Sequence, residues 1–278
     1  MLQPRARRYF KTNIDPPCVF AWHHPSSPCR RGITRRRTLR TAGAAETTAV
    51  EVVDLASTPL RELNQRLHDL AGGAPGPRLW RVLNPNGAHA VACGIDADVE
   101  VKIEGHVGYY CAGMNKLATV RVRGNAGPGL GENLSSGTVV VEGNASQSAA
   151  ATARGGLVVI RGDAAARCGI SMKGVDIVVR GSVGHLSGFM AQTGRLVVCG
   201  DAGEALGDSV YEARLYVRGN VATLGADCIE KELRAEHRAE LAELLLHAGI
   251  DDLDPGDFRR YGSARRLYNF HVDNAGAY

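Results

Sequence analysis

Segment 127–131, with the sequence Gly-Pro-Gly-Leu-Gly, is the stretch whose residue types most directly suggest chemistry. Dinucleotide-binding loops use such glycines to bring backbone amides close to a pyrophosphate, and a helix must follow the loop directly. Here the chain continues into another short strand that ends in Val-Val-Val-Glu-Gly143. We therefore interpret segment 127–131 as turn residues and expect no nucleotide site there.

Cysteine is both a metal ligand and a nucleophile, and the chain has seven: Cys18, Cys29, Cys93, Cys111, Cys168, Cys199 and Cys228. No C-x-x-C pair occurs, whereas zinc sites and iron–sulfur clusters need thiolates at close, fixed spacing. We therefore expect no metal and no cofactor on this chain. Scattered thiols fit a reducing compartment, so the sequence favours a cytoplasmic protein.

A catalytic histidine needs a base, an acid or a metal partner placed to work with it. His185 has no obvious partner of this kind, and neither a serine–histidine–acid set nor a pair of carboxylates stands out elsewhere. The sequence therefore predicts no catalytic, cofactor-binding or metal-binding residue.

The basic charge of the chain is concentrated at one end. The first 45 residues hold ten basic side chains against Asp15 alone, whereas the other 233 hold 23 basic and 28 acidic ones. A mildly acidic body argues against a nucleic-acid partner, and no apolar run approaches the ~20 residues of a membrane span. We interpret 1–45 as a disordered basic extension, with an organelle-targeting segment or an anion-binding arm as alternatives.

An internal repeat organises the middle of the chain. Short aliphatic strands end in seven marker glycines spaced nineteen residues apart: Gly105, Gly124, Gly143, Gly162, Gly181, Gly200 and Gly219. A fixed period near 20 residues with one strand per period is typical of a solenoid. We predict an all-β fold, a right-handed, single-stranded parallel β-helix of about seven coils over 96–226.

The repeat also predicts which side chains face inward. The residues two and four before each marker are Val, Ile or Leu, and those two after it are Val or Ala. Alternate strand positions share a face, so these columns form a core and polar columns lie between them. Cys111 and Cys168, both six after a marker, are expected to be buried thiols, three coils apart and too distant for a disulfide.

The outward column directly before each marker carries charge. Glu104, Arg123, Glu142 and Arg161 alternate in sign and are expected to stack as an ion-pair ladder, which contributes little to stability when exposed. An anion site at Arg161 and Arg180 is the alternative interpretation of the same column.

Segment 46–95 resembles an N-terminal α/β cap. We expect a strand at Val50–Leu55, a helix that Thr58 caps and that runs to Leu70, and strands at Leu79–Leu83 and Ala88–Ile95. The cap would cover the open strand edge of the first coil.

Segment 227–278 is the expected C-terminal cap. Asp227 and Glu230 have capping-box spacing and predict a helix over 228–247 that leaves the last coil and caps it. The tail that follows interleaves aromatic residues with arginine, which favours a partner-docking surface, while packing back on the solenoid is the alternative. The docking candidates are Phe258, Arg259, Arg260, Tyr261, Arg265, Arg266, Tyr268, Phe270 and Tyr278.

The coil pattern G-x-x-G-x-x-x-G is complete three times, at glycines 124/127/131, 181/184/188 and 200/203/207. This pattern resembles the glycine-repeat (GXGXG) β-helix family, which includes the C-terminal domain of the glutamate synthase large subunit and one of the subunits of formylmethanofuran dehydrogenase. As a free-standing chain, the sequence is most similar to the separate β-helix subunit of three-subunit glutamate-synthase-like enzymes such as N-methylglutamate synthase (methylamine–glutamate N-methyltransferase).

The resemblance implies a division of labour between subunits. A class-II glutamine-amidotransferase-like partner and a second partner with FMN and iron–sulfur clusters would carry the chemistry, and the β-helix subunit would brace them without catalytic residues of its own. Alternatives are a subunit of an ammonia-using glutamate synthase, a protein like the β-helix subunit of formylmethanofuran dehydrogenase, and a stand-alone binding protein.

The corner position seven residues after each marker is never larger than alanine, and Gly188 is one of its members. Because tight corners admit only small residues, we expect Gly188→Leu to misfold. Circular dichroism and gel filtration of the purified variant test this, and a stable Gly188→Leu protein that still assembles would contradict the corner assignment.

Overall fold

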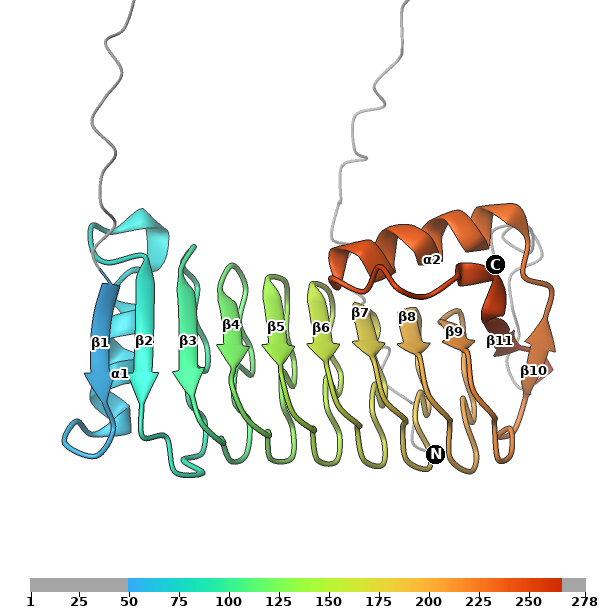
Figure 1. The fold of residues 1–278 in the computed structure, drawn as a ribbon, viewed down its shortest axis with the longest axis horizontal. Coiled ribbons are helices and arrows are strands. Elements are labelled where there is room, and N and C mark those ends of the chain that lie inside the picture. Colours follow the sequence, from blue (N-terminus) through green and yellow to red (C-terminus); the bar gives the residue numbers. More distant parts are fainter. Residues whose placement is uncertain (1–49, 267–278) are drawn as a thin grey trace, which may run out of the picture. The chain divides into compact units, whose positions relative to one another are not determined.

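The computed structural model describes residues 50–266, which lie within one compact unit, 47–278. Eleven strands form one row in the order β1-β2-β3-β4-β5-β6-β7-β8-β9-β11-β10 (Figure 1). They are β1 (Val50–Asp54), β2 (Leu79–Leu83), β3 (Glu100–Glu104), β4 (Thr119–Val122), β5 (Thr138–Val141), β6 (Leu157–Ile160), β7 (Lys173–Val179), β8 (Thr193–Val198), β9 (Arg214–Val217), β10 (Cys228–Lys231) and β11 (Arg259–Ser263). The α-helices are α1 (Leu60–His68) and α2 (Ala235–His247), and Ala71–Gly73 and Pro255–Asp257 form 3₁₀ turns.

The strands of the repeat pair in parallel, one per coil. Val101 lies beside Val120 and Val120 beside Val139, so each neighbour is nineteen residues further along the chain. On the opposite wall, parallel bridges join the residues two after each marker, from Val107 to Val221. The parallel β-solenoid expected from the period is thus confirmed, and β2 and β1 continue its strand row at the N-terminal end.

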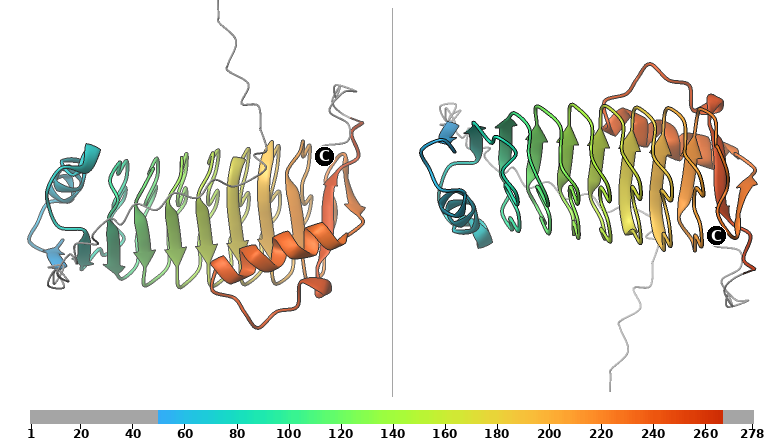
Figure 2. Two further views of the ribbon diagram at one scale, coloured as in Figure 1. Left: turned by 90° about the horizontal axis from the view of Figure 1, so that it is seen from above. Right: turned by 90° about the horizontal axis from the view of Figure 1, so that it is seen from below.

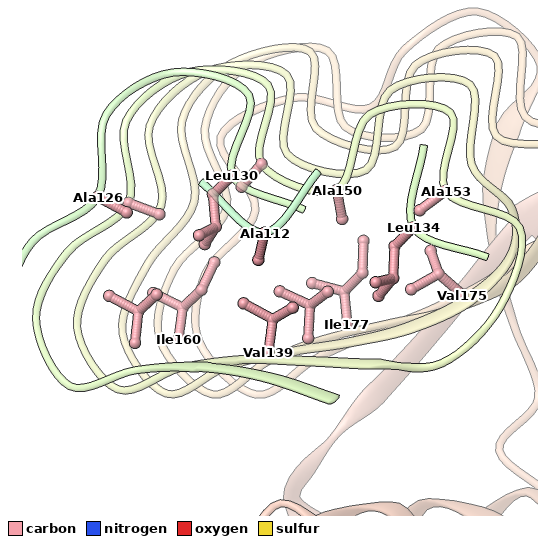
Figure 3. Packing of buried hydrophobic residues seen from close by; sticks show 14 of the residues in the cluster. Ala112, Ala126, Leu130, Leu134, Val139, Ala150, Ala153, Ile160, Val175 and Ile177 are labelled. Atoms are coloured by element: carbon pink, nitrogen blue, oxygen red, sulfur yellow. The ribbon is translucent and has the colours of Figure 1, made fainter. Parts of the chain in front are cut away.

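The predicted inward columns fill the coils. Val139, Ile160 and Ile177 are fully buried, and Leu130 and Ala150 pack against them from the facing wall (Figure 3). At the N-terminal end, Leu63 and Leu67 of α1 join the same core cluster. Strand β2 pairs with β3, and α1 packs on the same core, so together they cover the N-terminal end of the first predicted coil.

Each coil turns through residues in the left-handed backbone region. In the first full coil, Tyr110, Ala112 and Met114 have φ of 56°, 56° and 59°. These left-handed residues connect the coil to the coils on both sides. The Tyr110 amide donates to the Pro128 carbonyl of the next coil, and the Ala112 amide donates to the Val91 carbonyl of the preceding coil. Gly188 has φ of 69°, and an added Cβ would lie 3.2 Å from Leu215 Cδ2, consistent with its place at a corner.

Two expectations about the N-terminal segment are wrong. Residues 88–95 form turns rather than a strand, because Ala90 and Ala92 have φ of 55° and 54°, which an extended strand cannot include. In addition, Thr58 does not cap α1. Its amide donates to the Asp54 carbonyl, and Pro59 occupies the N-cap position.

The predicted helix over 228–247 is wrong in its first turns. Residues 228–231 form strand β10, and α2 begins at Ala235. The Asp227 carboxylate accepts hydrogen bonds from the Ser263 hydroxyl (2.6 Å) and the Arg266 amide (3.0 Å), so it joins β11 rather than opening a helix. β11 pairs antiparallel with both β9 and β10 and thereby covers the edge of the last coil, while α2 lies across the outer face of the strand row (Figure 2).

A ladder of side-chain acceptors runs beside the marker glycines. The residues one after each marker are His106, Asn125, Asn144, Asp163, Ser182, Asp201 and Asn220. The side chain of each of the first six accepts the backbone amide of its counterpart in the next coil, at 2.6–3.0 Å. A Cβ on Gly162 would lie 2.1 Å from Asn144 Oδ1, so the marker must lack a side chain for the ladder to form.

We expect Gly162→Ala to lower the free energy of unfolding by about 2 kcal/mol, because the added methyl displaces the Asn144 side chain from its amide partner. Urea unfolding followed by circular dichroism measures the change. Gly262→Ala is the matched control, since a Cβ there has no neighbour nearer than 3.7 Å. Equal stabilities of the two variants would contradict the proposed role of the marker.

Candidate functional site

The glycine-rich segment 127–131 is a turn of the solenoid, and strand β5 is the next element along the chain. Its three glycine amides are already bonded to adjacent coils. Gly127 and Gly131 donate to the Val107 and Cys111 carbonyls at 2.9 Å, and Gly129 donates to the Gln147 carbonyl at 3.0 Å. These amides are therefore not free to bind phosphate, in agreement with the interpretation of the segment as turn residues.

Cys111 and Cys168 are buried inside the coils, as expected from their column. Burial raises the pKa of the Cys168 thiol to about 12, and burial, with a smaller contribution from Cys93, raises the pKa of the Cys111 thiol. Both thiols are therefore protonated near neutral pH, whereas nucleophilic attack requires the thiolate. The five cysteines within 50–266 are all free, and Cys18 and Cys29 lie outside the described residues.

His185 is exposed on a turn, where its backbone carbonyl accepts the Arg167 amide at 2.9 Å. Within residues 50–266, no group of three or more His, Cys, Asp or Glu side chains is arranged to hold a metal ion. Neither α1 nor α2, the α-helices of that same range, has the length and apolar character of a membrane-crossing segment.

Several of the docking candidates in the C-terminal tail are bonded within the chain. Phe258 and Tyr261 are only 3% and 2% exposed, so the proposal that they contact a partner is wrong. Arg259 donates to the Gly219 carbonyl (2.7 Å) and Arg260 to the Glu232 carbonyl (3.0 Å). These residues pack back on the solenoid because β11 inserts beside β9.

Of the remaining docking candidates in the tail, Arg265 and Arg266 are within the described residues and the other three are not. The backbone amide of Arg265 donates to Ser263 Oγ (2.9 Å) and that of Arg266 to the Asp227 carboxylate. Tyr268, Phe270 and Tyr278 lie outside the described residues.

A second apolar column lies on the outside of the strand row, where polar residues were expected. Three residues before each marker from the third coil onward stand Val140, Val159, Val178, Val197 and Tyr216, all buried. Leu241, Leu244 and Leu245 of α2 and Phe258 cover this column and form a second core cluster with it. The sequence contains this signal, because an apolar residue recurs at the same outward position of five consecutive coils. An apolar column on the outer face of a sheet indicates that another element covers it.

Glu240 holds α2 on that outer face. Its carboxylate accepts hydrogen bonds from Arg214 (2.6 Å) and the Tyr216 hydroxyl (3.1 Å), and Arg195 lies 3.9 Å away. Arg195 also binds the Asp176 carboxylate through two nitrogens. Burial, and then Glu240, raise the pKa of the Tyr216 phenol, so the hydroxyl remains a donor to the helix.

The expected ion-pair ladder forms only at its N-terminal end. Glu104 pairs with Arg123 at 3.5 Å and with Arg81 of β2 at 3.0 Å. Arg161 instead donates to the Gly249 carbonyl at 3.2 Å, because the chain after α2 lies over this part of the column. The predicted continuation of the ladder to Arg161 is therefore wrong.

The alternative anion site at Arg161 and Arg180 is also wrong. Arg180 donates twice to the Asp252 carboxylate, at 2.9 and 2.7 Å. Hydrogen bonding from Arg180 lowers the pKa of Asp252 to about 2, so this pair stays ionised at neutral pH. The guanidinium groups of both arginines are thus turned to partners within the chain.

The outer face of β2–β4 has a different surface. At the positions that carry valine further along the row stand Arg81, Lys102 and Arg121, which are partly exposed. Glu100 lies 3.6 Å from Lys102 and 3.1 Å from Arg121. We call the six residues Arg81, Glu100, Lys102, Glu104, Arg121 and Arg123 the β2–β4 face.

These features define a class of protein: a parallel β-solenoid whose interior is filled mainly by aliphatic side chains and whose charged groups lie on its outer faces. No protein-family model matches the sequence. The chain is 63% identical over 227 residues to protein GlxC of Rhizobium meliloti (strain 1021), an alignment that covers 82% of this chain and 99% of that protein. The chain therefore belongs to the GlxC family.

We expect Glu240→Gln to loosen α2, since the neutral amide leaves Arg214 without its ionic partner at a partly buried position. The free energy of unfolding should fall by about 1 kcal/mol, and hydrogen exchange should accelerate in α2. Glu243→Gln, an exposed change on the same helix, is the control. If both variants exchange at the same rate, Glu240 does not anchor the helix.

Proposed function

We propose that this chain is a non-catalytic assembly subunit of a glutamate-synthase-like amidotransferase–flavoenzyme complex. The observation that carries the proposal is the filled solenoid: the glycine amides of 127–131 are bonded to adjacent coils, and the inner thiols Cys111 and Cys168 are buried. Its outer faces remain for contact with other proteins. The GXGXG pattern and the solenoid fold together support the glutamate-synthase-like class.

The specific complex that we propose is N-methylglutamate synthase, which converts methylamine and glutamate to N-methylglutamate and ammonia. In this reaction the methylamine nitrogen takes the place of the glutamate amino group, which leaves as ammonia. A class-II glutamine-amidotransferase-like subunit would handle the amine, and a subunit with FMN and iron–sulfur clusters would make the product. The present chain would hold the two in register.

The rigid coil stack suits such a role. Each coil is fixed to its neighbours by parallel strand pairing, by the acceptor ladder and by bridges on the opposite wall. A surface held in this way presents contact residues at set intervals along the stack, which favours simultaneous binding of more than one partner.

Co-expression tests the proposal. A tagged full-length chain should co-elute with an amidotransferase-like subunit and an FMN/iron–sulfur subunit, and the complex should turn over methylamine and glutamate. We expect flavin absorbance in the complex but neither flavin nor turnover in the isolated chain.

Other outcomes assign other functions. Turnover with ammonia in place of methylamine would indicate an ammonia-using glutamate synthase, and a co-eluting molybdenum or tungsten protein would indicate the role of the β-helix subunit in formylmethanofuran dehydrogenase. A chain that binds neither partner would overturn the proposal and favour a stand-alone binding protein.

A further inference from the structure

The outer face of the strand row is covered at one end and open at the other. Over β5–β9, α2 and Phe258 bury the valine column. Figure 2 shows α2 across the C-terminal part of the row, over β7–β9, and no helix of the described chain lies across the outer face of β2–β4. The outward column changes from valine to basic residues at the same place where α2 and the chain that follows it cease to cover it. Val140 is the first valine of the column, and Arg121 and Lys102 stand at the equivalent positions of the two preceding coils. Among residues 50–266, no segment covers the β2–β4 face in the way that α2 covers the valine column.

The β2–β4 face carries an excess of positive charge. Its four cations share only two carboxylates, because Glu104 pairs with Arg81 and Arg123 and Glu100 with Lys102 and Arg121. The four basic side chains keep between 42% and 61% of their surface exposed. Since the chain after residue 45 has more acidic than basic residues, this excess is a local feature.

Two hollows border the face and share Leu79 and Glu100 in their walls. The larger, of about 700 Å³, lies at the start of the strands and includes Leu117 and Arg121 together with Asp96 and Asp98, so the positive excess belongs to the face itself and not to this hollow. The smaller, of about 220 Å³, lies toward β1 and includes Val50. Val50 and Leu117 are more than half exposed, so apolar side chains flank the charged array on both sides.

We propose that the β2–β4 face docks a carboxylate-bearing surface of a partner protein, an inference that rests on the proposed function in assembly. Four cations that share two carboxylates, between exposed apolar residues, suit an acidic protein surface, which complements the net positive charge while burying Val50 and Leu117. The open, polar face differs from the enclosed apolar pockets that hold small molecules. Glu100 and Glu104 within the array oppose the closely spaced phosphates of a nucleic acid.

Charge variants of the full-length chain test the inference in the complex with the amidotransferase-like and flavoprotein subunits. For Lys102→Glu/Arg121→Glu, we expect the Kd for the partners to rise by about tenfold or more and its salt dependence to weaken. Glu100→Gln, which increases the positive excess, should lower the Kd. Arg167→Glu, an exposed charge reversal on a turn of a distant coil, is the control and should leave the Kd unchanged.

Carbodiimide cross-linking provides a second readout, because it joins an amine directly to a carboxylate in contact with it. Mass spectrometry of the wild-type complex should find Lys102 joined to an Asp or Glu of a partner, while the exposed Lys173, on β7, should not be so joined. This measurement does not depend on how the charge variants fold.

The outcomes separate this inference from the proposed function. If the wild-type chain binds the partners but the double variant binds equally well and Lys102 forms no cross-link, the docking face is wrong while the assembly function stands. If the wild-type chain binds no partner, the proposed function fails first. Binding of a single-stranded 20-mer DNA that the double variant abolishes would reassign the face to nucleic acid and overturn the inference.

Discussion

The close approach of successive coils at the marker glycines is the contact on which the rest of the structure depends. A Cβ at Gly143, Gly162 or Gly181 would lie 2.1–2.2 Å from the side-chain oxygen that the preceding coil contributes to the acceptor ladder. A larger residue would therefore displace that oxygen from the amide of the next coil. Because each coil of a solenoid contacts only its neighbours, no distant packing compensates for such a defect, and the parallel pairing on either side would weaken with it.

The same spacing determines how the interior is filled and how the backbone turns. Valine and isoleucine on the strand wall face alanine and leucine on the opposite wall, which leaves these side chains buried (Figure 3). The corners use left-handed residues such as Ala112 and Ala150, a conformation that costs roughly 1 kcal/mol for each non-glycine residue. Hydrogen bonds between coils offset that cost, since the amides of Ala112 and Ala150 donate to the Val91 and Leu130 carbonyls of the preceding coils.

With the interior filled, the outer surface carries whatever specificity this member of the GlxC family has. The surface is not uniform along the row. Over β5–β9 an apolar column is buried by α2, which Glu240 fixes through Arg214 and Tyr216, whereas over β2–β4 the same column is basic and open. The position three residues before the marker therefore differs in role along the row. Over β5–β9 its side chains pack against α2 and the chain that follows it, and over β2–β4 they carry exposed charge. We interpret this division as the basis of a scaffold that fixes its own C-terminal segment and presents its N-terminal coils to a partner.

The repeat predicted the solenoid, its register, its inward columns and the burial of Cys111 and Cys168, because it places the same residue types at nineteen-residue intervals and each coil makes the same local contacts. It also contained the outer valine column, but not the identity of the element that covers it. The path of the C-terminal segment depends instead on contacts between residues that are distant in the chain. Asp227 has local capping-box spacing, yet its carboxylate bonds to Ser263 and Arg266, 36 and 39 residues away, and strand β10 forms in place of a helical turn. Phe258 and Tyr261 look like a docking surface in sequence and are buried in the fold. Contacts between residues so far apart in the chain have no local signature, so short-range spacing cannot predict them.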